Sequence, residues 1–576
     1  MTQAHRRAVR WVVPGYALIL ALTVTAPLLG SGYLLLRDAV STPRSFFSDA
    51  ALGLTEAAPR AVPQDFLIAA LTTAVDGGLV VKTLLIGGLF LAGWGAARLA
   101  AVVVPDAGPA GQLVAATIAV WNPYVAERLL QGHWSLLMGY GALPWTAAAV
   151  VRLRSGEINP WWSGWAAVVF WIALAGLTPT GLILAAVVAL ACVAVAGSGV
   201  PRARCAAGIM VTSVLAAAPW LTASALSGAL ATSPSAGLAA FAARAEPGLG
   251  TLGSLAGLGG IWNAEAVPSS RTTLLALVAT AVLLAVVATG LPTVIRRPAA
   301  VPLLVLAAVS IVLPAAMATG PGLATLRAVV DAAPGLGVLR DGQKWVALAM
   351  PGYAVAAAGA VVTARGRLRP ALVALACVTA LIAVLPDLAW GAWNKVTPVR
   401  YPPGWAAVAE AIDADPGPVA VLPADSMRRF GWAGPAPVLD PLPRWVRAEV
   451  LTTGDLTISG QTVPGEGGRA RDVQRLLVTG ASPHELAGAG VRWVVVEGGS
   501  AGAMGNAQAA LERLAVTYRD ADLALYRVGG SSPVAAQGKR TAMVVAHAVW
   551  VALLVASGAA LAAGVRRRRR DVPSGT

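Results

Sequence analysis

Residues 541–565 read TAMVVAHAVWVALLVASGAALAAGV, an apolar run without a charged residue, and arginines fill positions 566–570 directly after it. A helix needs about 20 apolar residues to cross the hydrocarbon core of a bilayer. Apolar runs of similar character begin at Trp11 and recur along the chain. The stretch therefore predicts the last membrane span of a protein that crosses the membrane many times.

Composition extends this prediction to the whole chain. The 576 residues are 57% hydrophobic and only 12% charged, whereas soluble domains carry about 25% charged residues. So much apolar surface cannot be buried in a water-soluble core, so the bilayer must be the main solvent. The net charge of +15 would suggest nucleic acid as the partner of a soluble protein. Here the charge lies in short segments between apolar runs, so we expect the lipid bilayer and no nucleic acid.

These basic segments predict the orientation, because short loops rich in Lys and Arg lie on the cytoplasmic side. The clusters are Arg6, Arg7 and Arg10; Arg152 and Arg154; Arg202 and Arg204; Arg296 and Arg297; Arg365, Arg367 and Arg369; and residues 566–570. With every cluster inside, the chain is a multi-pass protein of the plasma membrane with both termini in the cytoplasm.

The predicted fold class is mainly α, a polytopic bundle of about twelve transmembrane helices. The spans are expected near 11–35, 79–97, 108–121, 136–151, 162–177, 180–198, 205–225, 272–294, 299–317, 345–364, 370–390 and 541–565. Residues 1–390 then form a bundle of about eleven spans with outer loops, 541–565 the last span and 566–576 a basic cytoplasmic tail. Small residues are abundant in the spans and favour close helix packing.

The outer side receives the longer segments 37–78, 122–134, 229–271 and 318–344, and Pro63 to Val75 suits a helix at the membrane interface. Between 391 and 540 polar residues return, and a small extracytoplasmic α/β domain is expected before the last span. Its predicted helices are 402–414 and 507–514. Its predicted strands are 418–422, 491–497, 516–518 and 523–528.

Soluble-enzyme motifs are absent: there is no phosphate-binding glycine loop, HExxH or GxSxG. What remains are ionisable residues at the outer ends of spans, where charge is costly and often functional. The first group is Asp38 between Arg37 and Arg44, with Asp49 close behind. Asp38 could be a general base beside arginines that hold an anionic substrate. The alternative, which the residues alone favour, is an interfacial ion pair that tethers the loop.

A second group lies in WNPYVAERLLQGHW, from Trp121 to Trp134. Here Glu127 and His133 could contact sugar hydroxyls while Arg128 contacts phosphate. The alternative is an aromatic belt with a capped helix turn.

The third group is Arg340, Asp341 and Lys344 in LRDGQKW. Its cations could clamp a lipid-linked phosphate, with Asp341 in the same substrate site. Alternatively, Lys344 could extend to the interface and Asp341 could cap the following helix. The Asp-Ala-Asp triplets at 413–415 and 520–522 resemble a metal-binding motif of nucleotide-sugar enzymes. We discount both, because they lie at a helix end and in a turn on the outer face.

Together, the Asp38 segment, the stretch WNPYVAERLLQGHWSLLMGYGALPW (121–145), LRDGQKW and the outer domain before a last span resemble actinobacterial GT-C-type membrane glycosyltransferases. The likeness is greatest to large actinobacterial membrane proteins of this architecture. It is more distant to arabinofuranosyl- and mannosyltransferases of the mycobacterial envelope. It covers most of the chain at the level of architecture.

The resemblance implies a polyprenyl-phosphate sugar donor that enters laterally and an acidic residue in the first outer loop that serves the reaction. Asp38 matches that position and Asp49 is the second candidate, although the paired acids often found in that loop are not adjacent here. The resemblance implies no definite cofactor and no metal ligands, and it leaves open a requirement for a divalent metal ion.

The sequence thus predicts a glycosyltransferase that moves arabinofuranose or mannose to an envelope glycan or glycolipid on the outer face. Asp38 would deprotonate the acceptor, and the donor phosphate would be held by Arg44, Arg128, Arg340 or Lys344. The alternative is a transporter, flippase or envelope-assembly scaffold. The chain shows no inverted repeat and no mid-span charged pair, which argues against transport. A scaffold stays open, since an inactive relative would keep the same architecture.

Overall fold

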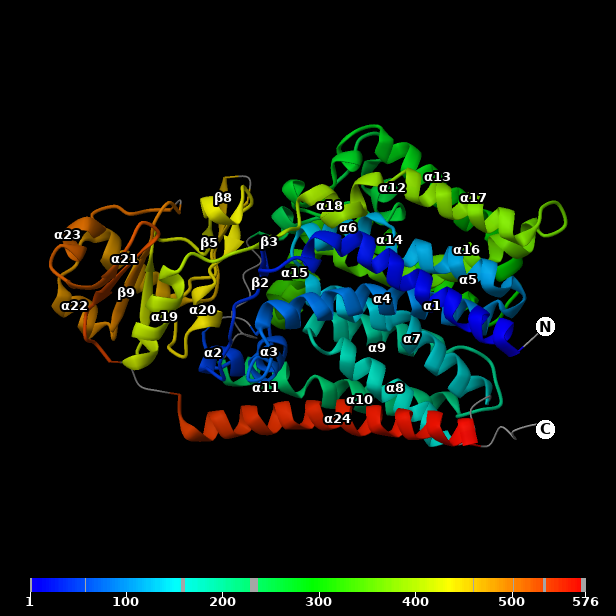
Figure 1. Cartoon of the computed structure of the whole chain (residues 1–576), viewed down its shortest axis with the longest axis horizontal. Coiled ribbons are helices and arrows are strands. Elements are labelled where there is room, and N and C mark those ends of the chain that lie inside the picture. Colours follow the sequence, from blue (N-terminus) through cyan, green and yellow to red (C-terminus); the bar gives the residue numbers. More distant parts are fainter. Residues whose placement is uncertain are drawn as a thin grey trace.

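The computed structural model describes residues 3–56, 59–156, 161–227, 237–458, 460–500, 502–531 and 535–570. Of the predicted tail, residues 571–576 lie outside this described part. The molecule is elongated, with a bundle of helices and an α/β domain at one end of it (Figure 1). Both chain termini lie at the opposite end of the bundle.

The bundle contains long apolar helices and several shorter ones. The longer helices are α1 (Gln3–Thr25), α4 (Gly77–Val103), α5 (Gly108–Val120), α7 (Trp134–Ser155), α8 (Trp161–Ala175), α9 (Pro179–Val193), α10 (Arg202–Ala216), α11 (Ala218–Ser227), α13 (Leu275–Val294), α14 (Val301–Met317), α15 (Gly320–Ala332), α16 (Ala349–Ala364), α17 (Pro370–Ala383) and α24 (Gln537–Arg570). The shorter helices are α2 (Asp49–Leu52), α3 (Gln64–Leu71), α6 (Pro123–Leu130), α12 (Gly250–Ala256) and α18 (Ala389–Asn394). Helix α3 falls within the predicted interfacial helix.

The predicted number of twelve spans is not confirmed. Within the described ranges, 6 helices are long and apolar enough to cross a membrane, or up to 9 if each bent helix pair is one span. The bent pairs are α10 with α11 (54°), α14 with α15 (94°), and α17 with the segment Pro386–Asn394 (73°). Helices α8 and α9 are apolar but shorter. Some apolar runs that the sequence predicts as single spans are therefore broken or short helices.

The first span ends earlier than predicted. Its apolar character continues to Leu36, but α1 ends at Thr25 and a short 3₁₀ turn follows. Residues Gly30 to Gly32 separate that turn from β1 (Tyr33–Leu36). The strand is apolar because both of its sides are covered by protein, and hydropathy alone does not distinguish such a strand from the end of a helix.

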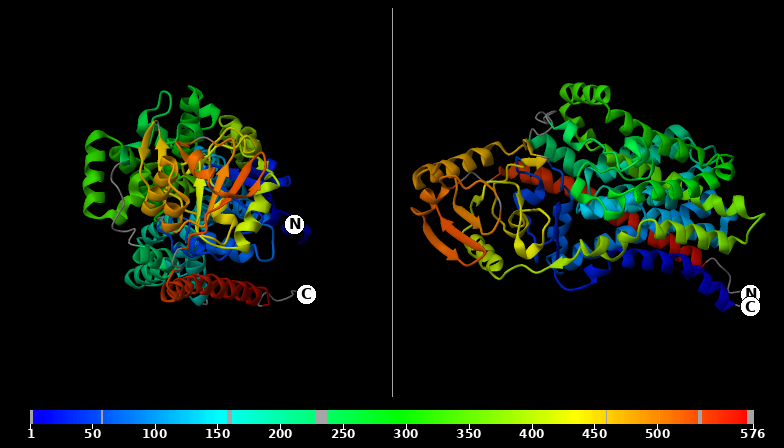
Figure 2. Two further views of the ribbon diagram at one scale, coloured as in Figure 1. Left: turned by 90° about the vertical axis from the view of Figure 1, so that its left-hand side faces the viewer. Right: turned by 90° about the horizontal axis from the view of Figure 1, so that it is seen from above.

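Helices α4, α5, α7 and α16 form the centre of the bundle, and α7 and α16 are its most buried spans. By contrast, α24 lies along the outside of the bundle in both Figure 1 and the end-on view of Figure 2. Close packing depends on small residues, as predicted. At Gly290 of α13, a side chain would collide with the backbone of Ala356 in α16.

The α/β domain has a sheet with the order β10-β11-β9-β4. Strands β4 and β9 are parallel, whereas β11 is antiparallel to both β9 and β10. Its strands are β4 (Val419–Leu422), β9 (Trp493–Glu497), β10 (Ala515–Arg519) and β11 (Leu523–Arg527), close to the predicted ones. Its helices are α19 (Gly404–Ala414), α20 (Leu442–Trp445), α21 (Gly468–Thr479), α22 (Pro483–Gly488) and α23 (Ala507–Leu511). The short hairpins β5–β6 (Met427–Arg428, Val438–Leu439) and β7–β8 (Leu456–Ile458, Gln461–Val463) complete it.

A small sheet joins this domain to the bundle. Strand β1 pairs with β2 (Ala39–Val40) on one side and with β3 (Pro398–Val399), which leads into the domain, on the other. The side chains of Leu35 and Val40 belong to the same apolar cluster as Trp405 of the domain. The segment between α1 and α4 thus contributes to the core of the α/β domain, so this segment and the domain are held in one position.

We predict that Gly290→Ala will lower the melting temperature of the purified protein, because the added methyl group meets the backbone of Ala356, and overpacking costs about 1–3 kcal/mol. Gly15→Ala in α1 is the control, since nothing lies within 4 Å of the added atom. Thermal unfolding in one detergent compares the two. Equal melting temperatures for both variants would contradict close packing of α13 on α16.

Candidate functional site

Asp38 lies in the tight turn of the β1–β2 hairpin. The residue before it, Arg37, has a φ of 49°, in the left-handed region, which allows the chain to reverse within two residues. The hairpin rests on the turn between α6 and α7, where Gly132 has a φ of +82°. A side chain at this glycine would collide with the backbone of Leu36 and Ala39. The glycine therefore allows the close approach that brings Asp38 against the α6–α7 turn.

Helix α6 carries two charged residues into the interior. The side chain of Asn122 caps the helix by accepting a hydrogen bond of 3.0 Å from the Val125 N–H, and a proline occupies the first helical position. Every residue of α6 is buried, and Glu127 and Arg128 are both 0% exposed. Because a buried charge is costly unless it is paired and hydrogen-bonded, both side chains need polar partners inside the protein.

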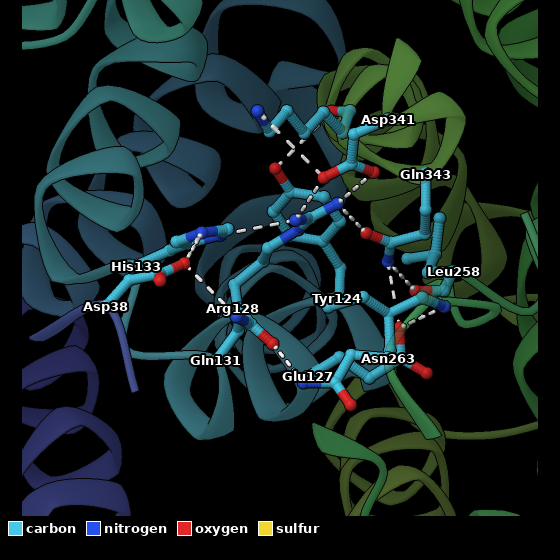
Figure 3. Close-up of polar contacts among 12 residues, drawn as sticks. Asp38, Tyr124, Glu127, Arg128, Gln131, His133, Leu258, Asn263, Asp341 and Gln343 are labelled. Atoms are coloured by element: carbon cyan, nitrogen blue, oxygen red, sulfur yellow. Dashed lines mark hydrogen bonds and ion pairs between the residues drawn. The ribbon is translucent and has the colours of Figure 1, made fainter. Parts of the chain in front are cut away.

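A continuous chain of hydrogen bonds leads from Asp38 to these residues (Figure 3). Asp38 Oδ2 lies 2.8 Å from His133 Nε2, and His133 Nδ1 lies 3.2 Å from a guanidinium nitrogen of Arg128. Arg128 donates bonds of 2.8 and 3.1 Å to the two oxygens of Asp341. Gln131 donates a bond of 3.1 Å to Asp38 Oδ2. Three predicted groups, far apart in the sequence, thus form one site.

The protonation of His133 follows from its neighbours. A guanidinium group can only donate hydrogen bonds, so Nδ1 of His133 accepts from Arg128. The proton of a neutral imidazole then lies on Nε2, which donates to the Asp38 carboxylate. Arg128 therefore selects the tautomer of His133, and the histidine in turn orients the carboxylate of Asp38.

Asp38 and Asp341, the two acids of this hydrogen-bond network, have lowered pKa values and are ionised at neutral pH. Burial raises the pKa of Asp38, but the hydrogen bonds from His133 and Gln131 outweigh burial and leave the pKa below its usual value. Burial likewise opposes ionisation of Asp341, whereas Arg128 and Lys344 lower its pKa to about 2. Burial lowers the pKa of His133, and the hydrogen bond to Asp38 does not fully restore it, so the imidazole is neutral.

The other side of Arg128 leads to Glu127. Arg128 donates a short hydrogen bond to the side-chain oxygen of Gln343, whose amide group donates at 2.9 Å to Glu127. The backbone N–H groups of Gly260 and Ile261 each donate to Glu127 at 3.1 Å. Glu127 therefore binds the loop before α13 to α6, and its carboxylate is occupied by protein donors rather than open to a sugar.

A second buried ion pair lies in that part of the bundle. Arg271 binds both oxygens of Glu246 and also donates to the hydroxyl of Thr280 in α13. Both charged side chains are almost fully buried, with 0% and 5% exposure. No sequence pattern in the segment 229–271 distinguishes this pair. It fixes the loop that supplies Gly260 and Ile261.

The structure places Asp49 and Arg44 apart from this network. Asp49 forms two hydrogen bonds, of 2.7 and 2.8 Å, with Arg540 at the start of α24. Arg44 is exposed, and its guanidinium lies 5.2 Å from the ring centre of Phe46. Among the described residues, no hydrogen bond or ion pair connects Asp49 or Arg44 to Asp38.

Arg340 and Lys344 lie at the open edge of the site. Lys344 Nζ is 3.9 Å from Asp341 and its side chain is 24% exposed. The side chain of Asp341 binds Arg128 and makes no capping hydrogen bond to the following 3₁₀ helix. Burial and the nearby cation Arg60 lower the pKa of Arg340 to about 10. The charges of Lys344 and Arg340 both interact with that of Asp38, and Arg60 lies near these two cations.

Sequence reasoning missed Arg60, Gln343 and Asn263. Arg60 pairs with Glu466 of the domain, at 2.5 Å. Asn263 donates a bond of 2.7 Å to Gln131, which itself donates to Asp38. A polar residue next to a predicted site, such as Gln343 in LRDGQKW, is a usable signal. Arg60 and Asn263 lie in long loops without any local pattern, so only the fold brings them here.

The discounted Asp-Ala-Asp triplets lie in the α/β domain. Asp415 binds Arg492 and Arg527, and Asp520 accepts hydrogen bonds within the turn between β10 and β11. Within the part of the chain that the structure describes, no group of three His, Cys, Asp or Glu residues could hold a metal ion.

Comparison with known proteins gives a fold relationship. No family model matches the chain, and no curated protein matches it. A solved structure of the arabinofuranosyltransferase AftD from Mycobacteria matches with a TM-score of 0.54 and 17% identity. This fold is similar to that of AftD. A second class of the same AftD variant gives a TM-score of 0.51 and 16% identity.

The matches to AftD cover 92% and 91% of this chain but only 42% of the AftD chain in each case. The chain thus spans less than half the length of AftD. At this identity the comparison concerns the fold, and at that level it confirms the predicted resemblance to GT-C-type membrane glycosyltransferases.

We predict that Arg128→Met will destabilise the protein strongly. Removing one partner of a buried ion pair leaves an uncompensated charge on Asp341 and typically costs about 3–5 kcal/mol. Lys344→Met is the matched control, because this partly exposed side chain is 3.9 Å from the same carboxylate and should contribute about 1 kcal/mol or less. Chemical denaturation of the purified proteins measures both changes. Similar losses in the two variants would contradict the central place of Arg128.

Proposed function

We propose that the chain is a membrane glycosyltransferase that moves arabinofuranose or mannose from a polyprenyl phosphate to an envelope glycan or glycolipid. The observation that carries the proposal is the chain Asp38–His133–Arg128–Asp341. At its buried end Arg128 is paired with Asp341, whereas the side chain of Asp38 at the other end is 35% exposed. Such a pattern suits a carboxylate held for a reaction rather than an ion pair that only tethers a loop.

In this reaction Asp38 is the general base. An acceptor hydroxyl loses its proton to Asp38 while its oxygen bonds to the anomeric carbon of the donor sugar. The bond from that carbon to the phosphate oxygen breaks, and polyprenyl phosphate leaves. The neutral imidazole of His133 donates a hydrogen bond to this carboxylate and so keeps it oriented. Positioned acid–base groups typically contribute about 10²- to 10⁴-fold in rate.

The donor phosphate is assigned to Arg340 and Lys344, with Arg60 as a third cation at the same edge. Guanidinium and ammonium groups bind phosphate by charge-assisted hydrogen bonds. Arg128 has no exposed surface and already binds Asp341 and Gln343, so its part is to position His133. The exposed Arg44 lies outside the site. A leaving phosphate between cations is stabilised without protonation.

For the topology, we propose that both termini are cytoplasmic and that residues 391–540 lie outside. Two observations support this: the basic clusters follow the positive-inside rule, and the termini lie at the end of the bundle opposite the α/β domain (Figure 1). The domain would hold the acceptor glycan, since its strand β6 contacts the hairpin that carries Asp38. The N–H of Leu439 in β6 donates to the carbonyl of Arg37 at 2.8 Å.

We predict that Asp38→Asn will lower sugar transfer by about 10²- to 10⁴-fold while leaving membrane insertion and folding unchanged, because the amide keeps the shape but accepts no proton. The measurement is transfer by the reconstituted protein, with a panel of polyprenyl-phosphate sugars and envelope acceptors. Asp49→Asn is the control, since its partner Arg540 lies apart from the site. Full activity of Asp38→Asn with loss in Asp49→Asn would move the base to Asp49. Full activity in both would exclude the loop from the mechanism.

We predict that His133→Phe will move the acid limb of the kcat/KM profile to higher pH. Asp38 must be ionised to act as a base, so activity is present above its pKa and is lost as the pH falls through it. The hydrogen bond from His133 lowers that pKa, and phenylalanine removes the donor while keeping an aromatic ring. His484→Phe on the surface of α22 is the control. An unchanged limb in His133→Phe would show that Asp38 is not the titrating base.

A further inference from the structure

A charged hollow lies at the other end of the bundle from Asp38. It has a volume of about 600 Å³. The residues that line it are Val103, Pro292, Thr293, Arg296, Arg297, Pro298 and Ala299. They come from the end of α4, the end of α13 and the turn between α13 and α14. Arg365, in the turn between α16 and α17, donates a hydrogen bond to the carbonyl of Asp106, next to this region. That turn lies at the end of the molecule that carries both termini (Figure 1).

Helices α13 and α14 beside the hollow have exposed apolar surfaces that a lipid chain can lie against. Helices α13 and α14 each pack mainly on α16 rather than on each other. Near the hollow their outward side chains are exposed apolar residues, namely Leu291 and Ile295 of the α13 end and Val301 and Val305 of α14. In a membrane protein such side chains face the lipid chains. The hollow therefore opens next to the hydrocarbon.

The two arginines of the hollow are not equivalent. Arg297 donates bonds of 2.7 and 2.8 Å to Asp106, and Arg365 donates to the Asp106 carbonyl. Those contacts tie three turns together. Arg296 is exposed, and no hydrogen bond or ion pair joins it to any residue that the structure describes. The hollow thus has one charge-compensated arginine, which is structural, and one uncompensated arginine beside it.

We propose that this hollow binds the phosphate group of an anionic membrane lipid, with Arg296 as its main contact. The lipid chains then lie along the exposed faces of α13 and α14. Basic pockets between membrane helices suit such headgroups, because charge and apolar area act together. A free phosphate ion would use only the arginine and not the apolar surfaces. This site is separate from the proposed donor site at Arg340 and Lys344 and does not depend on the enzymatic activity.

Native mass spectrometry of the detergent-purified full chain tests this proposal. The probes are phosphatidylglycerol, a polyprenyl phosphate, zwitterionic phosphatidylcholine and inorganic phosphate, each titrated separately. We expect retention of one phosphatidylglycerol or one polyprenyl phosphate and weaker retention of phosphatidylcholine. Arg296→Gln should weaken the anionic lipid by about fivefold, the usual contribution of one basic residue near an anionic lipid surface. The variant should fold normally, since Arg296 has no partner among the residues that the structure describes.

The control is Arg367→Gln, an exposed arginine in the turn between α16 and α17 that does not line the hollow. Its lipid binding should equal that of the unaltered protein. The lipid whose retention falls in Arg296→Gln, either phosphatidylglycerol or the polyprenyl phosphate, is the one that the hollow binds. An equal decrease in both variants would mean attraction by net charge alone and would overturn the site. Unchanged binding in Arg296→Gln, or retention of inorganic phosphate alone, would also overturn it.

Discussion

The buried ion pair between Arg128 and Asp341 is the constraint on which the site depends. A guanidinium with no exposed surface is tolerated only where a carboxylate and further acceptors surround it, so α6 and the segment before α16 must meet in one register. These residues are 213 positions apart in the chain. Once Arg128 is fixed, its hydrogen bond fixes the tautomer and ring of His133, and the ring fixes Asp38. The carboxylate of Asp38 thus takes its position from an ion pair that is almost fully buried.

Backbone packing acts together with this ion pair. The hairpin that carries Asp38 can lie against the α6–α7 turn only because residue 132 is a glycine. The α/β domain approaches the same hairpin from the other side, since the Arg37 N–H donates to the carbonyl of Pro437 at 3.0 Å. The residue before Asp38 is therefore bonded to the domain, while Asp38 itself is bonded to the bundle through His133. Because Arg37 and Asp38 are adjacent, a glycan bound to the domain near Arg37 would lie close to the carboxylate of Asp38 without any large movement.

Sequence reasoning located the site residues better than their partners. Asp38, Arg128, His133, Asp341 and Lys344 stand out because ionisable groups near membrane spans are costly, and that argument needs no fold. The partners of these residues cannot be predicted in the same way, because an arginine such as Arg128 can bind either a substrate phosphate or the carboxylate of Asp341. Burial of the arginine excludes the phosphate, and burial depends on contacts between residues that are far apart in the sequence. Hydropathy likewise predicted the membrane character but not the early end of α1, since a strand covered by protein is as apolar as a helix in lipid.

Charge compensation separates the two ends of the molecule. At the end near the α/β domain, the buried charges are paired, through Arg128 with Asp341 and Arg271 with Glu246, and the exposed group among them is the carboxylate of Asp38. At the other end, Arg296 is exposed beside apolar helix faces and has no partner within the described part of the chain. A buried network holds a reacting group still, because moving one member would leave another unpaired. An exposed arginine imposes no such order and instead attracts mobile anions in the membrane. An arginine is thus buried and fixed by its partners at one end of the molecule and exposed at the other, where we propose that it attracts a lipid.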